Sequence, residues 1–175
     1  MIERPASWAG ELAGEPRLRN LPMNELILMA HVLFGVACIL AAVCVFVDAL
    51  HASPVNAGRI RAMSWSSAAF MWISFIIGGF WYVTRYHVDK AIILKGPWPF
   101  AHGFFMESKE HVAILLLLLA TYLPIAARDN VAESRAARRV VLWTSALVVF
   151  VALSVEGAGA MIAMGVKVAL LASRH

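Results

Sequence analysis

Residues 26–50, LILMAHVLFGVACILAAVCVFVDAL, decide the class of this protein. The stretch is 25 residues long, and His31 and Asp48 are its only acidic or basic side chains. A helix rises about 1.5 Å per residue, so about 20 apolar residues cross the roughly 30 Å hydrocarbon core of a bilayer. The stretch is therefore long enough to span a membrane as one helix.

The whole chain has the same apolar character. Of its 175 residues, 61% are hydrophobic and 15% are charged, whereas a soluble domain has about 45–50% apolar and about 25% charged residues. The net charge is +4, but the basic residues lie in short segments between apolar runs, as in loops at a membrane surface. This composition excludes a disordered chain and argues against a soluble enzyme or a nucleic-acid-binding protein. Cys38 and Cys44 are expected to be buried thiols without a redox role.

Three further apolar runs predict an all-α integral membrane protein, folded as an up-down four-helix bundle. Backbone polar groups in lipid must be satisfied within the segment, so runs of this length are helices. The predicted domain covers 21–175, with spans at about 23–50, 63–86, 100–127 and 140–165. Residues 1–20 are predicted to form a polar tail, and the first apolar run is too long for a signal peptide.

The expected location is a bacterial-type inner (cytoplasmic) membrane. The ends of the spans define an N-terminal side and an opposite side, here called the arginine side because it carries Arg59, Arg61, Arg128, Arg135, Arg138 and Arg139. The N-terminal side has more Lys and Arg in total, spread over about twice the loop length. Because cytoplasmic loops are enriched in these residues, total count and density point to different sides. The density favours a cytoplasmic arginine side.

Ionisable side chains within the predicted spans gather at one depth. Measured from the arginine side at 1.5 Å per residue, His31 lies about 28 Å up its span, and His111 and Glu156 lie about 24 Å up theirs. Such side chains are costly in lipid and commonly mark functional sites. We therefore predict a polar layer near the N-terminal side. Its other expected members are Arg85, Glu107 and Lys109. Histidines expected to be solvated or interfacial are His51, His87, His102 and His175.

Small residues continue from this layer along three of the spans at helical spacing. They include Gly35 after His31, Gly78 before Arg85, and Gly159 after Glu156. A stripe of small residues marks the face of a membrane helix that packs against its neighbours. We therefore expect His31, Arg85 and Glu156 to point into the bundle. The stripes in full are His31, Gly35, Cys38, Ala42 and Val45; Ser67, Ser74, Gly78, Trp81 and Arg85; and Ser145, Ala152, Glu156, Gly159 and Ala163.

A b-type haem is the first ligand that the layer suggests. Haem held without covalent links in a helical bundle needs axial histidines from facing helices, small residues beside the ring and bases near its propionates. The predicted haem site has His31 and His111 as ligands, Arg85 and Lys109 at the propionates, and Gly35 and Gly78 beside the ring. The chain would then be an electron-transfer subunit, working with a quinone, with other membrane subunits or with a soluble redox partner.

Two alternatives remain open. Glu107 and His111 share one helical face, and with His31 and Glu156 they offer two imidazoles and two carboxylates to a single iron, copper or zinc ion. Alternatively, the chain is an accessory or assembly subunit of a larger membrane complex. Its polar layer would then lock the helices together or bind a quinone or lipid head group. No catalytic residue and no nucleic-acid partner is predicted.

Overall fold

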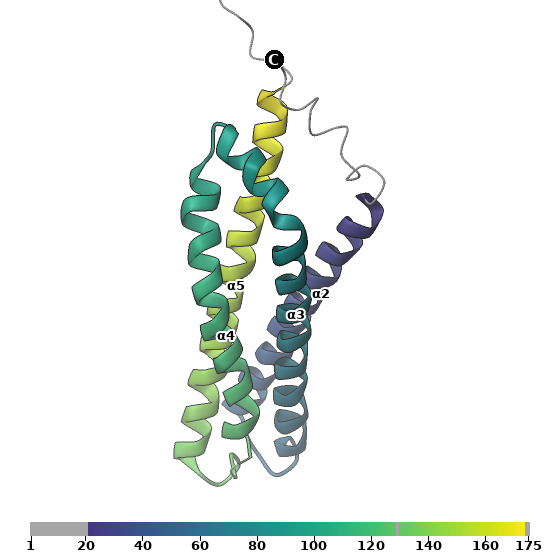
Figure 1. Ribbon diagram of the computed structural model, residues 1–175. Helices are drawn as coiled ribbons and strands as arrows, with labels where there is room; N and C mark the ends of the chain where they lie inside the picture. The colour runs from purple at the N-terminus through teal and green to yellow at the C-terminus, as the bar shows by residue number, and fades with distance from the viewer. Residues whose placement is uncertain (1–20, 129, 174–175) are drawn as a thin grey trace, which may run out of the picture.

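The computed structural model describes residues 21–128 and 130–173, which are almost entirely helical (Figure 1). Its elements are α2 (Leu21–Leu50), α3 (Ala57–Lys95), the π-helix η2 (Ala101–Met106), α4 (Glu107–Ala126) and α5 (Arg135–Ala172). These described ranges contain no strand. The all-α class is therefore confirmed, while the predicted tail at 1–20 lies outside the described residues.

Four helical stretches are long and apolar enough to cross a membrane: Glu25–Leu50, Ala57–Lys95, Ala101–Ala126 and Arg135–Ala172. The second and fourth are longer than predicted, because apolar composition marks only the part suited to lipid. Backbone hydrogen bonding continues a helix into polar flanks until a cap or a turn ends it. The Ser134 side chain caps α5 by accepting a hydrogen bond from the Ala137 amide at 3.2 Å. At the other end of α3, Pro97 follows Gly96 and stops the helix.

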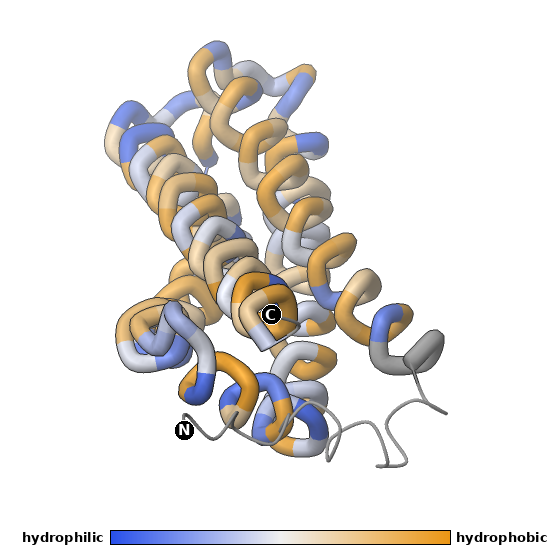
Figure 2. Tube along the Cα trace, turned by 90° about the horizontal axis from the view of Figure 1, so that it is seen from above, coloured by the Kyte–Doolittle hydropathy of each residue, from blue (hydrophilic) through white to orange (hydrophobic). Residues whose placement is uncertain are grey.

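Successive long helices run in opposite directions (Figure 1). The α2–α3 and α4–α5 loops lie at one end, the arginine side, and η2 lies at the other end with the C-terminal part of α5. Both α2 and α4 pack mainly on α3 and α5, which places α2 and α4 diagonally across the assembly. Along their length the helices are mostly hydrophobic, and hydrophilic segments lie mainly towards their ends (Figure 2).

The helices pack through the small side chains that form the predicted stripes. Buried stripe residues are Gly35, Cys38, Ala42 and Val45 on α2, Ser67 and Ser74 on α3, and Ser145 and Ala152 on α5. Their inward orientation is confirmed, and Cys38 Sγ lies 3.4 Å from Ser67 Oγ across the α2–α3 contact. Two expectations are wrong, since Cys44 and Ala163 are exposed. Both occupy helix positions that face away from the neighbouring helices.

The buried residues of α2 lie in its C-terminal part. No residue from Glu25 to Phe34 is buried, and Gly35 is the first buried residue of α2 whose side chain position is described. In Figure 1 the N-terminal part of α2, in purple, diverges from the other helices. His31 is partly buried and lies one turn before Gly35.

Candidate functional site

The candidate site is a polar layer to which all four long helices contribute. It consists of His31 from α2, Ser74 from α3, Lys109 from α4 and Glu156 from α5. Ser74 is buried, and the other three side chains are partly buried. Three glycines, Gly35, Gly78 and Gly159, provide the space in which these side chains lie.

The His31 ring is held by α3. Its Nδ1 lies 2.9 Å from the carbonyl oxygen of Ser74 and 3.0 Å from Ser74 Oγ. Ser74 Oγ in turn donates to the His31 carbonyl oxygen at 3.0 Å. Because a carbonyl oxygen only accepts, Nδ1 carries a proton, and Nε2 is an acceptor when the ring is neutral. Within the described residues, only Nδ1 of the ring makes a hydrogen bond.

Gly78 makes room for the His31 ring. It follows Ser74 by one turn on the same face of α3, and a Cβ at position 78 would lie 2.7 Å from His31 Cε1 and 2.8 Å from Nδ1. These distances are shorter than non-bonded atoms tolerate. The sequence led us to expect space beside Gly78 for a haem ring, but the imidazole of His31 occupies that space.

Gly35 makes room for the Glu156 side chain. A Cβ at position 35 would overlap Oε1 of Glu156 and would lie 3.6 Å from Ser74 Oγ. The carboxylate therefore lies against the backbone of α2, where α2, α3 and α5 meet. It fills the second space that the haem hypothesis assigned to a ligand.

Lys109 reaches the layer from α4. Its Nζ would lie 3.0 Å from a Cβ at Gly159, one turn beyond Glu156 on α5. Lys109 and Glu156 attract each other electrostatically, and the Lys109 charge also acts on His31. The Lys109 Nζ and the Glu156 carboxylate, both in the described part of the chain, do not come within the 4 Å of an ion pair. The opposite charges of Lys109 and Glu156 are therefore near each other without being in contact.

The structure does not bring His111 into this layer. Residues two apart on a helix point to nearly opposite sides, so His111 is exposed where Lys109 faces inward. The His111 Nδ1 bonds within its own helix, to the carbonyl oxygen of Glu107 at 2.8 Å. Glu107 is exposed as well. The predicted pairing of His31 with His111 as axial ligands is thus not assembled.

The predicted metal-ion set is not assembled either. Within residues 21–128 and 130–173, no group of three or more His, Cys, Asp and Glu side chains is placed to hold a metal ion. Of the four predicted ligands, His31 and Glu156 both belong to the polar layer, whereas Glu107 and His111 lie on the exposed face of α4. Arg85 is two turns beyond Gly78, about 10 Å nearer the N-terminal side. Its Nε is buried and has no hydrogen-bond partner in the part of the chain described.

A second polar contact near the N-terminal side was missed by the sequence reasoning. The Tyr86 hydroxyl lies 2.9 Å from His102 Nδ1, and both residues are buried. The expectation of a solvated His102 is therefore wrong, because the π-helix η2 turns this residue inward. Ala101, the first residue of η2, packs so closely on α5 that a Cβ at Gly165 would lie 2.6 Å from the Ala101 Cβ. Such local helix geometry has no clear composition signal.

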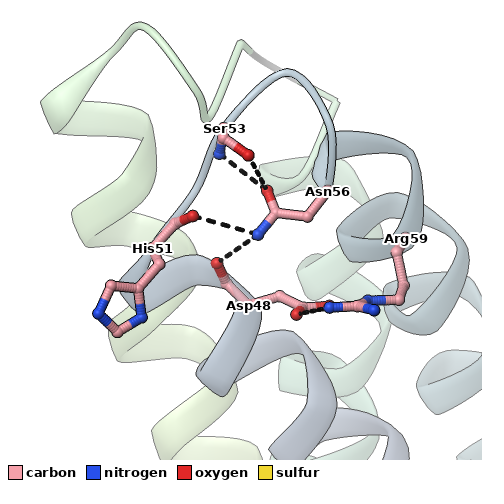
Figure 3. A network of polar contacts seen from close by, with 5 residues as sticks. All are labelled: Asp48, His51, Ser53, Asn56 and Arg59. Carbon is pink, nitrogen blue, oxygen red and sulfur yellow. Dashed lines mark hydrogen bonds and ion pairs between the residues drawn. The ribbon is translucent and has the colours of Figure 1, made fainter.

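A polar network at the arginine side closes the α2–α3 loop (Figure 3). The Asn56 amide donates to the carbonyl oxygens of Asp48 at 3.2 Å and His51 at 3.1 Å, and Asn56 Oδ1 accepts from the Ser53 amide at 2.8 Å. Arg59 binds the Asp48 carboxylate through both Nε, at 2.6 Å, and a terminal nitrogen. Asp48 therefore holds the α2–α3 loop to the start of α3, and the network has a structural role.

The polar layer combines three kinds of hydrogen-bonding group. Lys109 is a hydrogen-bond donor, Glu156 is an acceptor and proton carrier, and the Nε2 atom of His31 is a neutral acceptor. The backbones of Gly35 and Gly78 border the layer without side chains. Comparison of the chain with protein-family models, with curated proteins and with solved structures found no match.

Proposed function

We propose that the chain is an integral membrane protein, an up-down four-helix bundle in an inner (cytoplasmic) membrane. Large apolar side chains on its outer surface support this, such as Leu33, Trp143 and Phe150, which are 66%, 71% and 70% exposed. In water this surface would be strongly unfavourable, whereas lipid tails match it. The arginines gathered at one end favour a cytoplasmic arginine side.

We further propose that the polar layer binds the head group of a quinone-class molecule from the bilayer, in an electron-transfer subunit. The observation that carries this proposal is the separated pair of Lys109 and Glu156. Ionised side chains within a span are costly, and a polar ligand between Lys109 and Glu156 would bind to both charges. A quinone carbonyl accepts from Lys109, and a quinol hydroxyl donates to Glu156.

The packing of α2 supports access from the lipid. His31 lies where α2 leaves its neighbours, and the residues before it are exposed and mainly apolar, including Leu26 and Met29 at 69% and 67%. A ligand with an apolar tail can keep that tail in lipid beside this part of α2 while its polar ring reaches Glu156. A water-soluble ligand gains nothing from such a route.

The layer also suits the proton chemistry of a quinone. Reduction to the quinol takes up two protons and two electrons, and oxidation releases them. Glu156 and the Nε2 atom of His31 are the groups that exchange protons with the ring oxygens, while Lys109 stabilises negative charge on them. The electrons pass to or from a one-electron redox centre, such as a haem or an iron–sulfur cluster, in the same complex.

A b-type haem bound through His31 is the second candidate. Metal-ligating histidines usually donate their other ring N–H to a carbonyl or carboxylate, as His31 does to Ser74. Bound haem would supply one-electron transfer, and Lys109 would then face a propionate. Because His111 is exposed, this candidate uses His31 as the sole histidine ligand from the layer.

Analysis of the protein purified in mild detergent separates these candidates. We expect organic extracts to contain a quinone in an amount comparable to the protein, and Glu156→Gln to lose it. The matched control is Glu107→Gln, which changes an exposed carboxylate on α4. A Soret band and an α-band on reduction, lost in His31→Ala, would support haem in place of quinone. If no preparation contains quinone or haem, both candidates are contradicted, and an accessory subunit is favoured.

A further inference from the structure

A pocket lies at the arginine side, at the other end of the molecule from the polar layer. It has a volume of about 350 Å³ and is lined by Ala57, Arg61, Ala127, Arg128, Asn130 and Val131. A second hollow of about 400 Å³ is lined by Arg61, Trp65 and Arg128. Because the two share both arginines, we treat them as one site and call it the arginine pocket.

Two arginines from distant parts of the chain converge on this pocket. Arg61 lies in the second turn of α3, and Arg128 follows the end of α4. Both are exposed, and the described residues that line the two hollows include no carboxylate. Two guanidinium groups repel each other across a shared hollow, and an anion between them removes that repulsion. The pocket is therefore suited to a negatively charged group.

Neighbouring arginines of the same loops have structural partners. Arg59 pairs with Asp48, and Arg138 donates to the carbonyl oxygens of Ala52 at 3.2 Å and Ala132 at 3.3 Å. Those contacts fix the two loops against each other. The guanidinium groups of Arg61 and Arg128 make no hydrogen bond or ion pair with another described residue. Arg61 and Arg128 therefore take no part in those loop contacts, and both line the pocket.

Other lining groups point to a phosphate at the membrane surface. Ala57 is the first residue of α3, and the positive end of a helix dipole at its first turn attracts anions. Asn130 adds an amide donor. Trp65 lies one turn beyond Arg61 and is 58% exposed, as is typical of a side chain at the level of lipid head groups.

We propose that the arginine pocket binds the phosphate of an anionic phospholipid in the leaflet on the arginine side. Arg61 and Arg128 hold the phosphate, and the acyl chains extend along α3 beyond Trp65. Anionic lipids attract basic residues at the cytoplasmic surface. This inference rests on the proposed membrane location, but it does not depend on the ligand of the polar layer.

The test is native mass spectrometry of the full chain in detergent, titrated with phosphatidylglycerol or phosphatidylcholine. We expect phosphatidylglycerol to bind more tightly than phosphatidylcholine. In the double variant Arg61→Gln/Arg128→Gln, the affinity for phosphatidylglycerol should fall at least about tenfold, as expected for the loss of two charged hydrogen bonds. The control Arg135→Gln/Arg139→Gln removes the same charge from the same side outside the pocket. Equal loss in both double variants would overturn the proposal, because binding would then follow net charge alone.

A second titration identifies the source of the phosphate. Inorganic phosphate should bind weakly and be displaced by phosphatidylglycerol. Tight phosphate binding that phosphatidylglycerol does not displace would assign the pocket to a soluble anion and overturn the lipid proposal. The substituted side chains are exposed, so the double variant should have the same thermal midpoint as the wild type. If its midpoint falls, the single variant Arg128→Gln is used in its place.

Discussion

Replacing Gly78 with alanine tests whether the His31 ring is seated as the structure describes. The new Cβ would lie 2.7 Å from His31 Cε1, so the ring must move by about 1 Å to reach ordinary van der Waals separation. A shift of that size breaks the 2.9 Å hydrogen bond from Nδ1 to the Ser74 carbonyl oxygen. Overpacking and the lost bond together cost about 1–3 kcal/mol.

Gly79→Ala is the matched control, because nothing lies within 4 Å of a Cβ at that position. Both variants gain about 1 kcal/mol from replacing a helical glycine, so the difference between them isolates the contact with His31. The assay is unfolding of the detergent-solubilised protein, followed by helical circular dichroism. We expect Gly78→Ala to be less stable than Gly79→Ala by about 1–3 kcal/mol. Equal stabilities would refute the described seat of His31.

Two further predictions concern contacts at opposite ends of the molecule. Arg59→Gln should lower the thermal midpoint of the protein in detergent, because it leaves the buried Asp48 carboxylate without its ion pair. Arg61→Gln should leave the midpoint unchanged. Equal midpoints in the two variants would contradict a stabilising role of the Arg59–Asp48 ion pair. Tyr86→Phe should lower the free energy of unfolding by about 1 kcal/mol through loss of a buried hydrogen bond. Tyr122→Phe, at an exposed site, should lower the free energy of unfolding by less than about 0.5 kcal/mol. Similar losses of stability in the two variants would count against the buried hydrogen bond between Tyr86 and His102.

The helices and the depth of the polar layer could be predicted from the sequence, because both depend on local properties. The length of an apolar run predicts a membrane-spanning helix, and the fixed rise per residue gives the depth of each side chain within it. These rules correctly brought His31, Lys109 and Glu156 to one level from three different helices. Apart from the exposed Ala163, the small residues of the predicted stripes also marked the packed faces, since close approach of helices requires small side chains.

The partners within the layer could not be predicted from depth, because depth does not fix rotation. His111 and Lys109 differ by only two residues, but those two residues turn the side chain by about 200° around the helix. The buried positions Leu116 and Ala120 mark the inward face of α4, and Lys109 lies on that face. The inward turn of His102 depends on η2, and a π-helix arises from tertiary packing that no local pattern records.

The central claim is that Glu156 and Lys109 hold a quinone head group between them. Its most direct test is the equilibrium binding of a short-chain quinone to the purified protein, followed by quenching of tryptophan fluorescence. Glu156→Gln and Lys109→Met should each weaken binding by about 10- to 100-fold, the value of a hydrogen bond to a charged group. Glu107→Gln should bind as the wild type does. Wild-type affinity in both Glu156→Gln and Lys109→Met would contradict the account.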